Sequence, residues 1–111
     1  MSMNRKAMLS QPMANKTEEE IVATRERAIK ALEGMGYTVV NTLFTDEWYS
    51  QEAMTQRGVV HIPLAFFAKS VENMACCDAA YFCKGWESAR GCKLEHAVAE
   101  AYGVKIIYED S

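Results

Sequence analysis

Apolar and polar residues alternate with two different periods along the chain, and each change of period marks the boundary of a predicted element. Short apolar or β-branched runs predict strands at residues 6–10, 37–40, 79–83 and 104–108. Between them, apolar residues recur with the 3.6-residue period of a helix. The three predicted stripes are Ile21, Ala28, Ile29 and Leu32; Leu64, Phe67, Ala68, Val71 and Met74; and Leu94, Ala97, Val98 and Ala101.

Polar residues and proline mark where the predicted helices begin. Thr17 followed by Glu20 forms a capping box, which predicts the first helix start. Pro63 stands at the first position of the second main helix, and Ser88 is the predicted N-cap of the last one. Residues 41–62 lack a clear period, although Ser50 can cap a short helix that runs through Arg57.

The order of these elements is strand, helix, strand, helix, strand, helix, strand, which favours right-handed crossovers and a parallel sheet. We therefore predict one α/β domain over residues 1–111, a three-layer sandwich with strand order 2-1-3-4. In that order the ligand crevice lies between strands one and three, at their carboxyl ends. The loops at residues 10–13 and 84–88 are expected to meet there.

Composition and charge exclude several classes of protein. The chain has 111 residues, and no apolar run approaches the roughly 20 residues that span a bilayer, so we expect a soluble protein. Its N-terminus lacks the apolar stretch of a secretory signal, which predicts a cytoplasmic location. The net charge is −3 and the basic residues are scattered, which argues against a nucleic-acid polymer as partner.

The four cysteines show no metal-binding pattern. Cys76, Cys77, Cys83 and Cys92 form no CxxC pair and have no histidine at zinc-ligand spacing, so we expect no metal site. Reduced, mostly buried thiols are the favoured interpretation. The alternative, a redox pair formed by the adjacent Cys76 and Cys77, requires strained geometry.

Glu95 fits neither face of the last predicted helix. It stands between the apolar stripe and the wet face formed by Lys93, His96 and Glu100, and it lies one turn after Gly91. Helical side chains lean towards the N-terminus, so the carboxylate is expected over Gly91, where a ligand could fill the space left by the missing side chain. The alternative is a boundary glutamate that extends into water.

Several of these residues resemble a known family. Residues 85–91 (GWESARG), the Glu95-His96 pair with Ala99, and residues 10–13 (SQPM) resemble a small domain family of unknown function found in phages and bacteria. That family is similar, more distantly, to nucleoside 2-deoxyribosyltransferases and 2'-deoxynucleoside 5'-phosphate N-hydrolases. These are flavodoxin-like enzymes that usually form dimers or higher oligomers.

The resemblance implies roles for individual residues. Glu95 matches the nucleophile that attacks the anomeric carbon, Ser88 lies near a serine that holds a 5'-phosphate, and His96 stands where the enzymes often have glycine. Arg90 could add a grip on the phosphate, or instead pair with Glu87 on the surface. The expected substrate-binding residues are Ser10, Gln11, Pro12, Met13, Gly85, Trp86, Ser88, Arg90 and Gly91, with no cofactor.

A second acidic residue that the transferases carry before the third strand has no clear counterpart. Ser70, Glu72, Asn73 and, in the long loop, Asp46 all remain open. Asp78 is instead expected to bind neighbouring backbone N–H groups at the start of the third strand. The aromatic residue that follows the first strand in the transferases is missing, and Trp86 or Trp48 could stack on a base or fill the core.

Three functions follow from these expectations. The first is an enzyme in which Glu95 cleaves the N-glycosidic bond of a deoxynucleoside or its 5'-monophosphate. The second is a nucleotide-binding module without turnover, and the third is an oligomeric scaffold. A homo-oligomer is expected in each case, because a small sheet exposes its outer strands and the related enzymes complete their sites with a neighbouring chain.

Overall fold

A four-stranded parallel sheet forms the centre of the protein. The computed structural model describes residues 5–40 and 50–109. The strands are β1 (Arg5–Ser10), β2 (Tyr37–Val39), β3 (Ala79–Phe82) and β4 (Lys105–Tyr108). They pair in parallel in the order β2-β1-β3-β4. The predicted order 2-1-3-4 is confirmed, and each strand was predicted to within one residue at either end.

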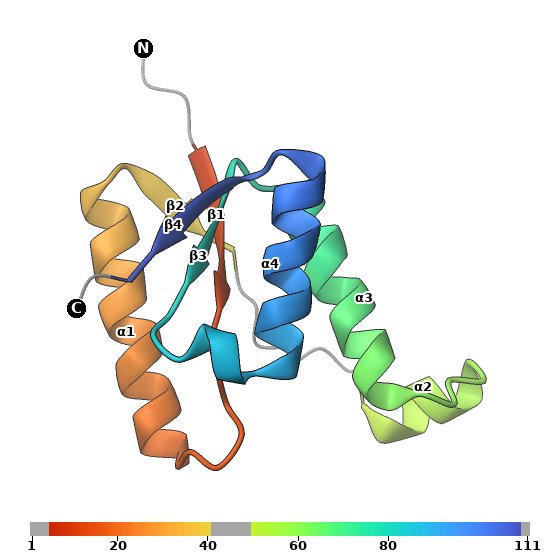
Figure 1. The fold of residues 1–111 in the computed structure, drawn as a ribbon. Helices are drawn as coiled ribbons and strands as arrows, with labels where there is room; N and C mark the ends of the chain where they lie inside the picture. Colours follow the sequence, from red (N-terminus) through yellow and green to blue (C-terminus); the bar gives the residue numbers. More distant parts are fainter. Residues whose placement is uncertain (1–4, 41–49, 110–111) are drawn as a thin grey trace.

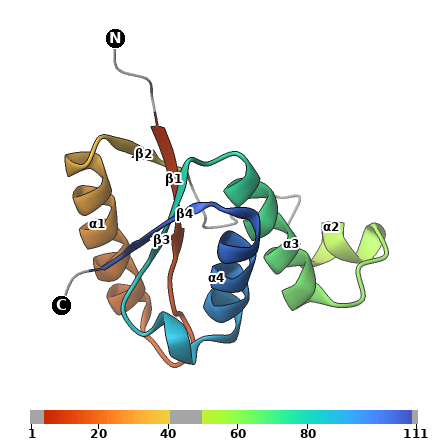
Figure 2. The ribbon, with the colours of Figure 1, turned by 45° about the horizontal axis from the view of Figure 1, so that its top comes forward.

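Helices cover both faces of this sheet, which gives the predicted three layers. Helix α1 (Glu18–Gly34) lies on one face, while α3 (Ile62–Ala75) and α4 (Arg90–Tyr102) lie on the other (Figures 1 and 2). The short helix α2 (Gln51–Gln56) sits beyond α3, away from the sheet. No described helix combines the length and apolar character needed to cross a membrane.

The side chains of β1 alternate between two separate hydrophobic clusters. Ala7 and Leu9 pack with α1, whereas Met8 packs with Met74 of α3 and Ala99 of α4. Successive side chains of a strand point to opposite faces. Ser10 therefore points to the same face as Met8, towards α3 and α4, and it is 1% exposed.

Two of the three predicted helix caps are confirmed. Thr17 and Glu20 form the reciprocal capping box of α1. The Ser50 hydroxyl accepts a hydrogen bond from the N–H of Ala53 and caps α2. Residues 41–49, which include Asp46 and Trp48, lie outside the described residues.

The prediction that Ser88 caps α4 is wrong. Gly85 has φ 87° and starts the tight 3-10 turn η2 (Trp86–Ser88), in which Ser88 takes part. The first extended residue after this turn is Ala89, which becomes the N-cap of α4 and has no side chain that can accept a hydrogen bond. The turn therefore shifts the start of the helix by one residue.

The predicted buried faces of α3 and α4 also need correction. In α4 the buried residues are Cys92, Glu95 and Ala99, while Leu94 is 47% exposed and Ala97 and Ala101 face solvent. In α3 Ser70 and Asn73 are buried with Met74, whereas Leu64 and Ala68 are exposed. The stripe of α1 packs as predicted, with Ala28 and Leu32 buried.

The cysteines are all free thiols, but only two are fully buried. Cys83 and Cys92 lie in the interior, Cys77 is half-buried and Cys76 is exposed. Burial raises the pKa of Cys83 to about 12 and the pKa values of Cys77 and Cys92 to about 11. Their thiols are therefore protonated at neutral pH.

Candidate functional site

The carboxylate of Glu95 lies inside the protein, at the carboxyl end of β1. The Ser10 hydroxyl donates a hydrogen bond to Glu95 Oε1 over 2.5 Å, although 84 residues separate the two in the chain. Glu95 is 8% exposed. The prediction that it stands at the margin of the apolar stripe is wrong, because it occupies the centre of the buried face, and it does not extend into water.

Three elements bring polar groups to this carboxylate. Ser10 reaches it from β1, Ser70 reaches it from α3, and Cys92 lies on the preceding turn of α4. Buried polar groups are rare in a hydrophobic layer unless they are paired. The cluster of Ser10, Ser70 and Glu95 is therefore a polar site enclosed between the sheet and two helices.

Two opposing influences act on the Glu95 carboxyl group. Burial is the stronger one and raises its pKa, because the charged form loses hydration. Hydrogen bonds from Ser10 and then Ser70 lower the pKa, because they stabilise the charged form. The net result is a raised pKa, which is a recurrent property of carboxyl groups that do chemistry.

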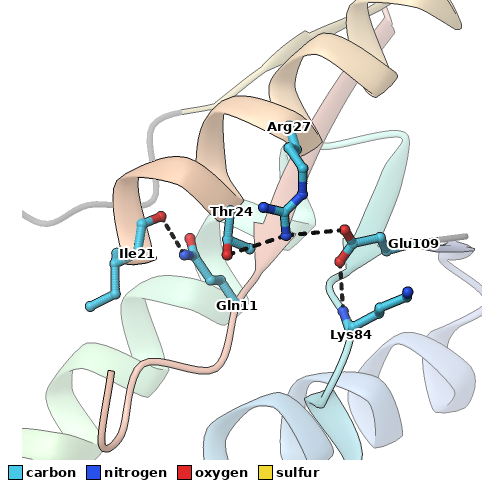
Figure 3. A network of polar contacts seen from close by, with 6 residues as sticks. All are labelled: Gln11, Ile21, Thr24, Arg27, Lys84 and Glu109. Atoms are coloured by element: carbon cyan, nitrogen blue, oxygen red, sulfur yellow. Dashed lines mark hydrogen bonds and ion pairs between the residues drawn. The ribbon is translucent and has the colours of Figure 1, made fainter. Parts of the chain in front are cut away.

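The two predicted loops meet beside this cluster. The N–H of Cys83 donates to the carbonyl of Ser10 over 3.0 Å. A Cβ on Gly85 would lie 3.7 Å from Cγ of Pro12, so the two loops lie close together. Gln11 is buried and turns to the other face, where its Nε2 donates to the carbonyl of Ile21 (Figure 3). Met13 is 44% exposed.

An acidic residue at the end of β4 holds the second loop in place. The Glu109 carboxylate accepts a hydrogen bond from the Lys84 N–H over 2.8 Å and pairs with Arg27 of α1 over 3.4 Å (Figure 3). Glu109 therefore connects the end of β4, the loop that follows β3, and helix α1. No pattern in the sequence predicts this role of Glu109.

Trp86 and His96 stack on each other rather than facing Glu95. Their ring centroids lie 4.1 Å apart at an interplanar angle of 15°, and Trp86 also contacts Phe82. The His96 Nε2 atom lies 2.6 Å from the Tyr108 hydroxyl. His96 was expected on the wet face, but it is half-buried among these rings on the β4 side.

A hollow opens between the first turns of α3 and α4. Its volume is about 470 Å³, and it includes Gly91, where an added Cβ would meet no atom within 4 Å. This is the unfilled space expected at Gly91. The residues that line the hollow are His61, Pro63, Leu64, Phe67, Arg90, Gly91 and Leu94.

The predicted phosphate ligands are both at the surface. Ser88 is exposed in η2, and Arg90 is exposed at the start of α4. Arg90 forms no ion pair with Glu87 or with any other residue in the described ranges. Its guanidinium is therefore available at the rim of the hollow.

The structure separates the candidates for a second site residue. Glu72 points outward and pairs with Lys69 over 2.8 Å, while Ser70 and Asn73 are buried on the side of α3 that faces inward. The Nδ2 atom of Asn73 has no hydrogen-bond partner. Asp78 accepts a hydrogen bond from the Lys6 N–H over 2.8 Å, which confirms its predicted structural role.

Sequence reasoning missed several residues of the candidate site. Cys92 was expected only as a buried thiol, and Leu64 and Phe67 were expected in the core rather than along a hollow. The position of Cys92 beside Glu95 could have been predicted from the sequence, because Cys92 precedes Glu95 by three residues and so lies on the same helix face. No group of three or more His, Cys, Asp or Glu side chains in residues 5–40 and 50–109 is arranged for a metal ion.

Comparison with protein families gives one match. The model of the family described as Domain of unknown function (DUF4406) matches residues 6–108, which includes every described element except the first residue of β1. The chain belongs to this family. Searches of the curated proteins and of the solved structures found no match. The DUF4406 match therefore covers both crevice loops and Glu95, while the similarity to deoxyribosyltransferases stays a prediction.

Proposed function

We propose that this DUF4406 protein cleaves the N-glycosidic bond of a deoxynucleoside 5'-monophosphate or deoxynucleoside, with Glu95 as nucleophile. The observation that carries the proposal is the Glu95 carboxylate itself, enclosed beside the carboxyl end of β1 and oriented by Ser10 over 2.5 Å. In doubly wound sheets the crevice next to the first and third strands is where ligands bind. The expected resemblance of Gly91, Glu95 and Ala99 to a deoxyribosyltransferase pattern points to the same glutamate.

The reaction proceeds in two displacements at the anomeric carbon. A Glu95 oxygen forms a bond to C1', and the bond between C1' and the base nitrogen breaks with its electron pair moving to the base, which takes a proton from water. Water then attacks C1' and gives up one proton to the hydroxide left when the base was protonated; the ester bond to Glu95 breaks, and its electron pair returns to the carboxylate. A second base in place of water gives base exchange.

The Ser10 hydroxyl has two effects in this scheme. It occupies one side of Oε1, which fixes the orientation of the carboxylate, and it stabilises the charged form that attacks. The raised pKa of Glu95 means that only the fraction ionised at a given pH can act as nucleophile. Ser10 and Ser70 are therefore positioning residues, and Glu95 is the catalytic residue.

A nucleotide-binding module without turnover is the second candidate. Its support is the nature of the groups that α3 contributes, since Ser70 and Asn73 are neutral where the transferases carry an acid. No carboxylate other than Glu95 is buried in the described part of the chain. A site of this kind can hold a nucleotide yet lack a group that assists the leaving base.

Base release is the test of the proposed activity. The protein is incubated with each of the four deoxynucleoside 5'-monophosphates and each deoxynucleoside, and free base is measured by chromatography. We expect release by the wild type, loss of at least about a hundredfold in Glu95→Gln, and unchanged release in Glu87→Gln, an exposed control. Release that survives Glu95→Gln contradicts the proposal, and binding of an intact nucleotide favours the second candidate.

A further inference from the structure

We propose that the hollow between α3 and α4 binds the base of a deoxynucleoside 5'-monophosphate, whose phosphate is held by Arg90 at the rim. This inference rests on the function proposed above and adds where the base and the phosphate of the substrate bind. It assigns the hollow to the substrate. It also gives Phe67 and Leu64 a role in binding.

The helical repeat places the Glu95 site one turn below the residues that line this hollow. Residues three or four positions apart lie one above the other on a helix. Ser70 lies one turn below Phe67 on α3, and Glu95 lies one turn below Gly91 on α4. Because Ser70 and Glu95 interact, these two lower positions meet beneath the hollow.

Gly91 lines the hollow and lies one turn above Glu95 on α4. It carries no side chain, and an added Cβ would have open space around it. The Glu95 side chain leans towards the N-terminus of α4, and therefore towards Gly91. A sugar placed over Gly91 has C1' facing the carboxylate and its base facing the α3 wall.

The walls of the hollow suit a flat heterocycle with an anionic tail. Phe67 and Leu64 on α3 and Leu94 on α4 form an apolar slot, and a volume of about 470 Å³ lies within the range of small-molecule sites, roughly 300–1,000 Å³. Leu64 is 59% exposed and Leu94 is 47% exposed. A base stacked in the slot would shield these apolar side chains from water. Arg90 supplies a planar cation that binds phosphate with two hydrogen bonds.

Two variants that fill the slot with a larger side chain test this assignment. Gly91→Leu places a leucine in the slot from α4, and Leu64→Trp places a tryptophan there from α3; both positions are exposed and have room for the larger side chain. The matched controls are Gly34→Leu, a helical glycine of α1 with equally open surroundings, and Val22→Trp, which is 44% exposed on α1. The affinity of each deoxynucleoside 5'-monophosphate is measured by calorimetry in a Glu95→Gln background, and KM is measured with Glu95 intact.

We expect both filled variants to lose affinity by at least about tenfold, with a matching rise in KM, while both controls stay within about twofold of the wild type. Arg90→Ala should raise KM about tenfold or more for the monophosphates and leave KM for the free deoxynucleosides unchanged. Leu64→Trp acts from the opposite wall, so a Gly91→Leu variant that fails to fold does not remove the test.

The two proposals fail in different ways. If the wild type releases base and both filled variants keep its KM, the base binds elsewhere and the role of Glu95 stands. If the wild type releases base and Arg90→Ala affects monophosphates and deoxynucleosides equally, the phosphate assignment is wrong. If the wild type neither binds nor cleaves any member of the panel, the proposed function is wrong and this inference is lost with it.

Discussion

Glu95 is a buried acid whose surroundings act on its charge in opposite directions. Burial raises the pKa of its carboxyl group, and hydrogen bonds from Ser10 and Ser70 lower it. A single hydroxyl therefore influences both the geometry and the ionisation of the proposed nucleophile. Two substitutions test these influences on the pKa of Glu95.

Replacing Ser10 with alanine removes the hydrogen bond that stabilises the Glu95 carboxylate. The pKa of Glu95 then rises further, so the acid limb of the pH profile of kcat/KM for base release should move to higher pH. The measurement is the pH profile of the Ser10→Ala variant beside the wild type. A limb that stays in place, or moves to lower pH, contradicts the role of Ser10.

Replacing Glu95 with glutamine should change how stability depends on pH. A carboxyl group with a raised folded pKa binds its proton more tightly in the folded state, so its stabilising contribution is fully present below the unfolded pKa of about 4.5 and is lost as pH rises through the folded pKa. Relative to Glu95→Gln, the wild type should therefore lose unfolding free energy from about pH 4.5 upward. Urea denaturation across pH measures the difference, and a gain with rising pH contradicts the raised pKa.

Helix α4 carries the site, and its start is weakly fixed. Its N-cap is Ala89, which makes no side-chain hydrogen bond, whereas Thr17 gives α1 a complete capping box. A helix that begins with unpaired N–H groups is less stable than one with a side-chain cap. The first turn of α4 borders the hollow, so its stability matters for the site.

Ala89→Ser should supply the missing cap. The serine hydroxyl can accept a hydrogen bond from the first turn of α4, which is expected to raise the free energy of unfolding by about 0.5–1 kcal/mol. Thr17→Ala is the opposite control and should lower it by about 1 kcal/mol through loss of the capping box. Thermal and urea denaturation measure both, and an unchanged or lower stability of Ala89→Ser argues against a free cap position.

The sequence predicted the elements well and the faces of two helices poorly. The strands, the capping box of α1 and the meeting of the two loops follow from local period and topology. The buried face of α4 consists of Cys92, Glu95 and Ala99, which contribute little hydrophobic signal, while Leu94 dominates the pattern yet lines a hollow. The buried face of α4 includes Glu95 because Ser10 and Ser70 pair with its carboxylate. Both residues are distant from α4 in the chain, and the periodicity of α4 carries no information about these contacts.

At the scale of the whole molecule, a contact near the C-terminal end connects the layers. Glu109 accepts a hydrogen bond from the Lys84 N–H of the crevice loop and pairs with Arg27 of α1 (Figure 3). Its side chain is 12% exposed, while that of Arg27 is 60% exposed. The outer strands of the sheet are β2 and β4, and the expectation of a homo-oligomer stays a prediction that light scattering can test.

The two halves of the Glu109 contact should contribute unequally to stability. Arg27→Ala removes an exposed ion pair and should cost less than about 1 kcal/mol. Glu109→Ala also removes the hydrogen bond to the Lys84 N–H, so it should cost more, about 1–3 kcal/mol. Urea denaturation of both variants gives the comparison, and equal losses would show that the backbone hydrogen bond contributes nothing.

If Glu95 is the nucleophile, it forms a covalent bond to the sugar, and a trapping experiment can detect that bond. A 2'-fluoro-arabinonucleoside 5'-monophosphate slows hydrolysis of the sugar ester, because the fluorine destabilises the positively charged transition state. After incubation with this analogue, the protein is digested and its peptides are weighed by mass spectrometry. We predict that the peptide containing Glu95 gains the mass of the fluorinated sugar phosphate and that Glu95→Gln gains none. Base release by the wild type with the sugar attached to another residue, or to none, contradicts the role of Glu95 as nucleophile.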